Sequence, residues 1–172
     1  MEFLNSKLED FNEIFRLYDL AIEFQKTKFD KTWLPFDKKL IEQEIAENRH
    51  WKIVNDNEFA CIFSIAFSDP LIWKEKNDAP AIYIHRIVTN PDFRGNKFVP
   101  KIVDWARIYT KSIGKKFIRM DTWGDNQKLI DYYVDCGFEF LGVITPTKTA
   151  ELPKHYEGIT LSLFEIKIAE NI

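Results

Sequence analysis

The segment from residue 81 to residue 123 constrains the fold of this chain most. It opens with AIYIHRIVT, an apolar run rich in β-branched residues that is typical of a strand, and the turn NPDF follows. Val99, Ala106 and Ile113 then fall on one face of a helix, and Gly114 suits the end of that helix. The next segment, KKFIRMDTW, indicates another strand. A strand, a helix and a strand in this order form a crossover unit that joins parallel strands, so the chain requires a sheet with a parallel pair.

Helices and further strands are expected on both sides of this crossover unit. Leu8, Phe11, Tyr18 and Ile22 fall on one face of a helix. The runs WKIVN and EFACIFSIAF are separated by NDN, which favours a hairpin. The expected elements are helices over 8–26, 40–48, 98–113 and 126–136, and strands over 51–55, 58–67, 81–89, 115–123, 138–144 and 159–168. This order predicts the α/β (α+β) class, with a mixed, mostly antiparallel central sheet covered by helices.

Length, charge and cysteine content narrow the class of protein further. The 172 residues favour one domain over 1–172, because a single hydrophobic core stays efficient up to roughly 250 residues. With 24 basic and 27 acidic side chains, the net charge of −3 gives no basic field for nucleic acid or an anionic membrane. Cys61 and Cys136 form no C-x-x-C pattern, which argues against a disulfide framework and a zinc site. The opening residues lack the apolar core of a signal peptide, so we expect a cytoplasmic protein.

The junction between the strand over 81–89 and the next helix is a candidate anion site. The first backbone N–H groups of a helix have no partner within the helix and carry the positive end of its dipole. Arg94 and Lys97 flank this junction, and Pro100 fits only in the first turn of a helix that begins near Lys97 or Phe98. The residues alone leave two interpretations open: a phosphate site, and a solvated basic turn that caps a helix.

Two motifs make the chain similar to a known family. The run HRIVTNPDFRGNKFV, the strand FIRMDTW and the run NQKLIDYYVDCGF resemble the GCN5-related N-acetyltransferase (GNAT) superfamily over residues 81–144. Asn126, Tyr133, Gly137 and Phe138 stand at the spacing of the family's second motif. The resemblance implies a splayed parallel strand pair at a cofactor cleft and helices on both faces of the sheet. It also implies an N-acetyltransferase, which moves acetyl from acetyl-coenzyme A to a primary amine by direct attack, and it implies no metal.

The resemblance assigns residues to acetyl-coenzyme A. The backbone of Ile87, Val88 and Thr89 would pair with the pantetheine arm, and Asn126 would bind nearby. The pyrophosphate would lie on the loop formed by Arg94, Gly95, Asn96, Lys97, Phe98 and Val99. Lys97 and Val99 stand where the family has glycine or alanine, so their side chains can hinder close backbone approach, although the Lys97 ammonium can contact a phosphate directly. Asn126 is also a favoured N-cap for the helix over 126–136, and both roles can hold together.

Amine attack on a thioester requires one group that removes a proton from the nitrogen and one that protonates the departing thiolate. Tyr133 matches the family's tyrosine on the thiolate side, and its alternative role is a core aromatic residue beside Tyr132 and Phe138. His85 lies just before the residues assigned to the arm, and the ordinary histidine pKa of about 6.5 suits proton abstraction at neutral pH. The alternative for His85 is a buried structural imidazole, and the sequence favours neither.

The acceptor site is expected beside the same cleft. By resemblance it uses the segment between the first two helices and the loop before the last strand, where the candidates are Phe24, Phe29, Trp33, His155 and Tyr156. Core or lid packing is the alternative for these aromatic residues. Asp69, Glu75 and Asp78 lie in the loop before the strand of His85, where they either attract a cationic amine or are simply solvated.

The expected partner is a small-molecule or peptide amine, with neither nucleic acid nor a membrane. The oligomeric state stays open, a homodimer included. A second function remains as an alternative, in which a degenerate GNAT-like module binds acyl-coenzyme A or a protein partner without turnover. Lys97 and Val99 motivate this alternative, because they depart from the glycine pattern of the phosphate loop.

Overall fold

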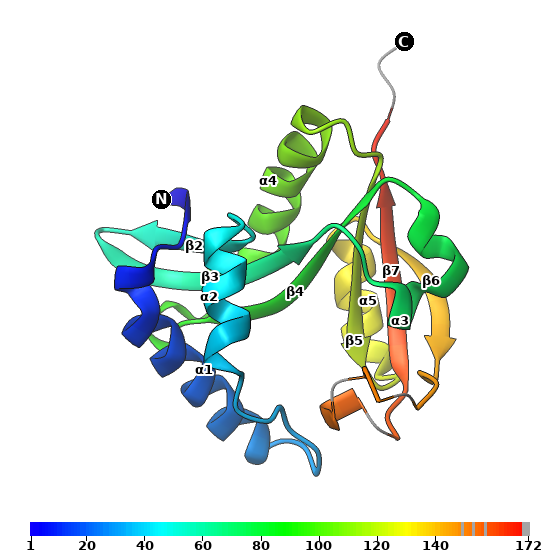
Figure 1. Cartoon of the computed structure of the whole chain (residues 1–172), viewed down its shortest axis with the longest axis horizontal. Helices are drawn as coiled ribbons and strands as arrows, with labels where there is room; N and C mark the ends of the chain where they lie inside the picture. The colour runs from blue at the N-terminus through cyan, green and yellow to red at the C-terminus, as the bar shows by residue number, and fades with distance from the viewer. Residues whose placement is uncertain (149, 153, 157, 170–172) are drawn as a thin grey trace. The chain divides into compact units, whose positions relative to one another are not determined.

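The crossover unit and the strands expected around it are present in the computed structural model (Figure 1). The structure describes residues 1–148, 150–152, 154–156 and 158–169. Within this part of the chain, seven strands form one sheet in the order β1-β2-β3-β4-β5-β7-β6. β4 (Ala81–Thr89) and β5 (Phe117–Trp123) are parallel, whereas β1 with β2, β2 with β3, and β7 with both β5 and β6 are antiparallel. The expected class, a mixed and mostly antiparallel sheet with helices, is confirmed.

The first of two compact units comprises Met1–Ile65 and Arg86–Phe98. It holds β1 (Glu2–Asn5), a 3-10 turn (Leu8–Asp10), α1 (Phe11–Lys26), α2 (Lys38–Ala46), β2 (His50–Asn55), nearly all of β3 (Glu58–Ala66) and the last residues of β4. Asp56 and Asn57 both have a positive φ, as a tight two-residue turn between β2 and β3 requires. The core cluster of this unit contains Ile14, Leu17, Tyr18, Ile41, Ile45, Ile62 and Val88. Tyr18 and Ile22 of the helical face expected near the N-terminus are therefore buried, Phe11 is partly buried, and Leu8 is exposed on the 3-10 turn before α1.

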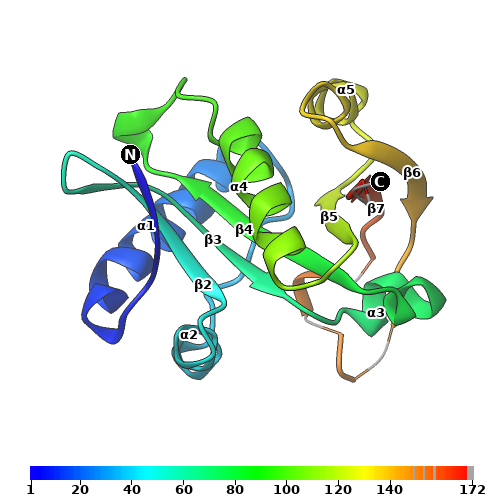
Figure 2. The same ribbon diagram turned by 90° about the horizontal axis from the view of Figure 1, so that it is seen from above.

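The second unit comprises Ala66–His85 and Val99–Ile172. Its helices are α3 (Pro70–Trp73), α4 (Phe98–Ser112) and α5 (Gln127–Asp135), and Phe98 is the one residue of α4 that belongs to the first unit. Its strands are the start of β4, β5, β6 (Glu139–Ile144) and β7 (Leu161–Lys167), and it also holds 3-10 turns over Lys74–Asp78 and Lys154–Tyr156. Trp73 of α3 packs in one cluster with Leu163 of β7, whereas Tyr133 of α5 packs against Phe164. Because neighbouring residues of a strand point to opposite faces, α3 and α5 cover opposite faces of β7 (Figure 2).

Two short elements differ from the sequence-based expectation. β1 pairs with β2 as an edge strand, and α3 with its 3-10 turn occupies the loop expected over 68–80. Pro70 fits there because the first turn of a helix needs no N–H from it. Among the described residues, no helix combines the length and the apolar character needed to cross a bilayer.

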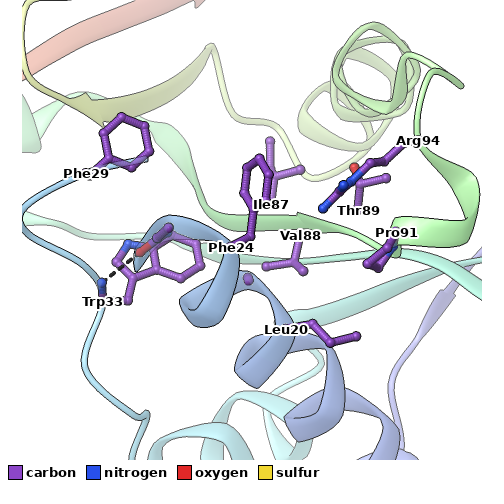
Figure 3. A pocket seen from close by; sticks show the side chains of 11 residues that line it. Leu20, Phe24, Phe29, Trp33, Ile87, Val88, Thr89, Pro91 and Arg94 are labelled. Carbon is purple, nitrogen blue, oxygen red and sulfur yellow. Dashed lines mark hydrogen bonds between the residues drawn. The ribbon is translucent and has the colours of Figure 1, made fainter. Parts of the chain in front are cut away.

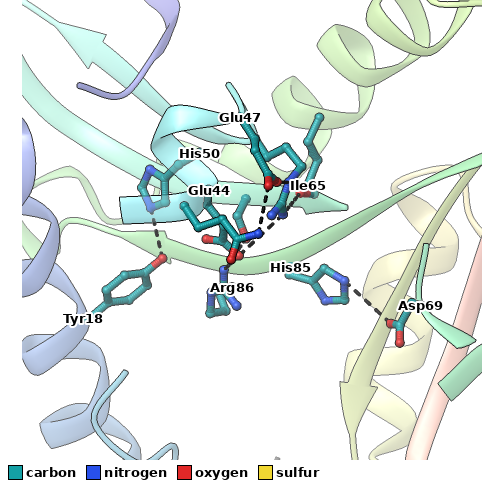
Figure 4. A network of polar contacts seen from close by, with 11 residues as sticks. Tyr18, Glu44, Glu47, His50, Ile65, Asp69, His85 and Arg86 are labelled. Atoms are coloured by element: carbon teal, nitrogen blue, oxygen red, sulfur yellow. Dashed lines mark hydrogen bonds and ion pairs between the residues drawn. The ribbon is translucent and has the colours of Figure 1, made fainter. Parts of the chain in front are cut away.

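Arg86 anchors the middle of β4 within the first unit. Its φ of 52° is unusual for a strand residue other than glycine, so it interrupts the regular alternation of side chains. The guanidinium forms an ion pair with Glu44 of α2 and donates to Oγ of Ser64 at 2.8 Å (Figure 4). It also lies over the ring of Phe36, 5.3 Å from the ring centroid. These contacts hold the strained residue in place.

Candidate active site

The parallel pairing of β4 with β5 ends two residues before His85 on β4 and Asp121 on β5. The register pairs Tyr83 of β4 with Arg119 of β5 at its far end, and the Arg119 guanidinium donates to the Tyr83 hydroxyl at 3.0 Å. His85 and Asp121 each follow that pair by two residues, so each side chain continues the same face of its strand. In the same register the two residues would stand opposite one another.

His85, Asp69 and Asp121 form a cluster in the second unit. Nε2 of His85 lies 3.6 Å from Oδ2 of Asp69 (Figure 4), and one nitrogen or oxygen from each residue lies within 4.8 Å of those of the other two. Asp69 stands directly before α3, where its backbone N–H donates to Oδ1 of Asn77 at 2.6 Å. All three residues are only partly exposed. One loop and two strands thus bring two carboxyl groups and an imidazole together.

Both carboxyl groups of the cluster hold a proton more tightly than an ordinary aspartate. Burial, together with the negative charge of Asp69, raises the pKa of Asp121 to about 7. Burial likewise raises the pKa of Asp69 to about 6. Oδ1 of Asp121 is buried and has no hydrogen-bond partner among the residues that the structure describes. Groups that titrate near neutral pH beside an imidazole are suited to proton transfer. The three side-chain atoms are also close enough together to hold one metal ion, which a chelator tests.

Tyr133 lies on the opposite face of the sheet from the cluster, against β7. Its ring packs against Phe164 with 5.1 Å between centroids, on the α5 face of β7. Asp121 lies opposite Leu163 in the register of β5 and β7, and Leu163 packs on the α3 face. Burial raises the pKa of the Tyr133 hydroxyl, and the neighbouring Tyr132 and the charge of Asp121 add to this effect. The hydroxyl therefore keeps its proton at neutral pH, as a proton donor must, while the ring contributes to the core.

The loop between β4 and α4 has the backbone shape that a glycine-rich phosphate loop would need. Gly95 has a φ of 86° and Lys97 a φ of 51°, directly before α4 begins at Phe98. Lys97 thus takes the left-handed conformation that glycine adopts without strain. Residues 94–97 are exposed, whereas the Phe98 side chain is buried and leaves only its backbone to face a ligand. Within the loop, the Asn96 amide donates to the carbonyl oxygen of Phe93 at 2.8 Å.

Asn126 caps α5. Its Oδ1 accepts hydrogen bonds from the backbone N–H groups of Lys128 at 3.0 Å and Leu129 at 3.4 Å. The N-cap interpretation is thereby confirmed, and a role toward the cofactor would use the amide nitrogen instead.

A pocket of about 300 Å³ in the first unit brings together residues assigned by resemblance to the acceptor and to the cofactor (Figure 3). Phe24, Phe29 and Trp33 come from the end of α1 and the segment after it, and they line the pocket with residues 87–89 of β4. The guanidinium of Arg94 lies over the Phe24 ring, 4.6 Å from its centroid. The Trp33 backbone N–H donates to the Gln25 side chain at 2.8 Å, which fixes the segment after α1.

Other residues expected in the site lie elsewhere. Val99 is half-buried in the first turn of α4. Tyr156 belongs to the second unit, where it packs against Trp123 with 6.3 Å between ring centroids. His155 lies on the 3-10 turn before it, and its side chain falls outside the described residues. Cys61 and Cys136 are free thiols, in line with the absence of a disulfide framework.

The sequence motifs do not single out Asp121, although one signal was present. In FIRMDTW it is a charged residue within a strand that is otherwise mostly apolar, beyond Arg119, whose partner is Glu165. The sequence marks Asp69 only as a loop charge, which either attracts a cationic amine or is simply solvated. What the sequence lacks is the register of β4 and β5 and the path of the loop before α3, which together bring both carboxyl groups to His85.

Solved structures share this arrangement of elements. A GNAT acetyltransferase from Listeria monocytogenes 4b F2365 has a TM-score of 0.77 at 21% identity, over 96% of this chain and 94% of that one. An N-acetyltransferase from Staphylococcus aureus Mu50 has a TM-score of 0.69 at 16% identity, over 98% of each chain. YncA from Salmonella typhimurium, solved with its cofactor acetyl-coenzyme A, has a TM-score of 0.67 at 12% identity, over 99% of this chain and 95% of that one. The fold is that of the GNAT acetyltransferases.

Sequence comparison extends this result from fold to family. Residues 11–138 match the model of the acetyltransferase (GNAT) family. The chain belongs to this family of acyltransferases, as the motifs had indicated. YesJ, an uncharacterized N-acetyltransferase of Bacillus subtilis strain 168, is 28% identical over 74 residues, which are 43% of this chain and 41% of YesJ. The match thus spans less than half of that relative's length.

Proposed function

We propose that this chain is an N-acetyltransferase that moves the acetyl group of acetyl-coenzyme A to a primary amine of a small molecule or peptide by direct attack. One observation carries this proposal: His85 lies in one cluster with two carboxyl groups on one face of the sheet, while Tyr133, whose hydroxyl keeps its proton, lies on the other face. Direct attack needs a base at the nitrogen and an acid at the sulfur, and no covalent enzyme intermediate.

The β4–α4 loop fits the cofactor. Acetyl-coenzyme A supplies the thioester that the amine attacks. The left-handed backbone at Gly95 and Lys97 lets the loop N–H groups turn toward an anion at the start of α4, and the Lys97 ammonium adds positive charge. The backbone of residues 87–89 would pair with the pantetheine arm. The structure of YncA with acetyl-coenzyme A supports this choice of cofactor.

Two side chains then move the protons. His85 accepts a proton from the acceptor ammonium, which frees the nitrogen lone pair for attack on the thioester carbon. Tyr133 donates its hydroxyl proton to the sulfur as the carbon–sulfur bond breaks. The pocket of Phe24, Phe29 and Trp33 in the first unit is the candidate site for the part of the acceptor that does not react, as the resemblance assigns these residues to the acceptor.

Release of free thiol from acetyl-coenzyme A over a panel of primary amines tests this function. We expect amine-dependent release, and a His85→Gln variant should lose on the order of 100-fold in kcat while its dissociation constant for acetyl-coenzyme A stays within about twofold. Cofactor binding without release for any amine would contradict the function and favour the module without turnover. A wild-type rate in the variant would remove His85 from the mechanism.

A further inference from the structure

The proposed reaction removes two protons from the acceptor nitrogen, and His85 accounts for one. An ammonium carries three hydrogens and the amide product one, so two protons leave the nitrogen during a turnover. The thiol product gains one proton from Tyr133, which must then be reprotonated from solvent. The net release is one proton per turnover. A site that holds two proton acceptors beside the nitrogen would complete this sequence without waiting for solvent between the two transfers.

We propose that the Asp121 carboxylate is the second proton acceptor at the acceptor nitrogen and that Asp69 is the positioning residue for His85. This inference rests on the proposed function. In the order of events, His85 takes the first proton before attack. Asp121 takes the second from the nitrogen once the carbon–nitrogen bond has formed, and both groups release their protons to solvent after the products leave.

Geometry supports Asp121 in this role. It follows Arg119 by two residues and His85 follows Tyr83 by two, so both continue the face on which the Arg119 and Tyr83 side chains already meet. Its carboxyl group lies in the cluster whose side-chain atoms are all within 4.8 Å of one another. An acceptor nitrogen bound at one member is therefore within reach of the next.

The surroundings of Asp121 are poorly explained by a structural role. Oδ1 is buried with no hydrogen-bond partner among the described residues, an arrangement that weakens a fold and recurs at functional sites. The charged group nearest along its own strand face, Arg119, is already bound by Glu165 and Tyr83. Among the titratable groups around Asp121, the charge of Asp69 from the loop before α3 acts on it, and His85 of β4 lies in the same cluster. The charge of Asp121 in turn acts on Tyr133 of α5.

Asp69 has a different role from Asp121, because it positions His85. Its Oδ2 lies 3.6 Å from Nε2 of His85, and the hydrogen bond from its backbone to Asn77 fixes the loop that carries it. Its negative charge also helps to keep the pKa of Asp121 near 7, which matches that carboxylate to proton transfer at neutral pH.

Steady-state kinetics of Asp121→Asn tests the proposal, with Asp104→Asn as the matched control. Asp104 is exposed on α4, outside the cluster, so the same chemical change there should leave the rate unchanged. We expect Asp121→Asn to lose at least about 30-fold in kcat with an unchanged dissociation constant for acetyl-coenzyme A. The acidic limb of kcat/KM against pH should move to lower pH, because the group that titrates near pH 7 is gone.

Asp69→Asn tests the positioning role through the same pH profile. Loss of its charge should lower the pKa of Asp121, so the acidic limb should shift to lower pH while kcat falls about fivefold, and Asp69→Glu should restore the wild-type profile. A purely structural residue would change the melting temperature without moving the limb.

The outcomes separate the two proposals. Absence of thiol release by the wild type with every amine overturns the proposed function and this inference with it. An active wild type together with a fully active Asp121→Asn variant overturns this inference alone. Loss of wild-type activity in EDTA, restored by added zinc, would make the cluster a metal site and overturn it as well.

Discussion

Lys97 stands where the phosphate-loop motif of the family has glycine, yet its backbone keeps the left-handed conformation that glycine adopts there. Its φ of 51° lies in the left-handed region, which costs a residue with a Cβ atom roughly 1 kcal/mol. We expect Lys97→Gly to raise the free energy of unfolding by about 0.5 to 1 kcal/mol, measured by urea denaturation. Lys97→Ala is the control, since it removes the same side chain but keeps the strain. Equal stability of the two variants would contradict the strain argument.

Tyr133 is both a core ring and a candidate acid, and Tyr133→Phe separates the two. The variant keeps the ring contact with Phe164 and loses only the hydroxyl. If the hydroxyl donates to the departing sulfur, kcat falls strongly while the dissociation constant for acetyl-coenzyme A barely moves. The expected change in stability is at most about 1 kcal/mol. Normal turnover with a lower melting temperature would assign Tyr133 to the core alone.

At the scale of residues, the sequence predicts the site residues that belong to a motif. It does not predict the residues that enter the site through contacts between distant segments. His85 and Tyr133 stand at positions that the family resemblance marks. Asp121 stands in no motif, and its place beside His85 depends on which residues of β4 and β5 face each other. Asp69 was visible only as one charge among several in a loop, because nothing in the sequence fixes that loop against β4.

At the scale of elements, strong periodicity was reliable and short segments were not. Tyr18 and Ile22 of α1 are buried, as the spacing of three and four residues predicted. β1 has only four residues, too few for an alternating apolar pattern to predict a strand. Its pairing with β2 stabilises it. α3 has four residues, too few for a helical period to show in the sequence.

The cap of α5 allows a test of Asn126 that separates its two roles. Asn126→Asp keeps a side-chain oxygen for the N–H groups of Lys128 and Leu129 but loses the amide nitrogen. We expect it to retain the melting temperature and to weaken acetyl-coenzyme A binding, measured by calorimetry. Asn126→Ala, the comparison variant, should lose about 1 kcal/mol of stability as well. Unchanged affinity in the aspartate variant would leave Asn126 with the cap only.

At the scale of the whole molecule, Asp121 should impose a pH dependence on stability. Its pKa rises from an ordinary value of 3.8 to about 7 on folding, so between these values the folded state binds more protons than the unfolded state. Stability from this group is therefore present at low pH and is lost as the pH rises from about 4 to about 7. His50, whose pKa is lowered to about 3 by burial, titrates in the opposite sense over much of this range.

The measurement is accordingly a difference between variants. The melting temperature of Asp121→Asn should equal that of the wild type near pH 4, exceed it increasingly up to pH 7, and remain higher by a constant amount above pH 7. A constant difference at every pH would mean that the carboxyl group does not titrate as proposed. Combined with the loss of kcat expected for the same variant, this result would show a side chain retained for catalysis at the expense of stability.

Acetyl-coenzyme A should stabilise the chain by mass action, because a ligand of the native state raises the free energy of unfolding as its concentration exceeds the dissociation constant. We expect a saturable rise in melting temperature. Lys97→Glu should weaken the affinity by about tenfold or more, since it places a negative charge beside the phosphates at the start of α4. Lys97→Gln is the matched control: it keeps the strained backbone and removes only the positive charge, so it should weaken binding less. Equal shifts for the wild type and both variants would mean that the phosphates bind away from Lys97.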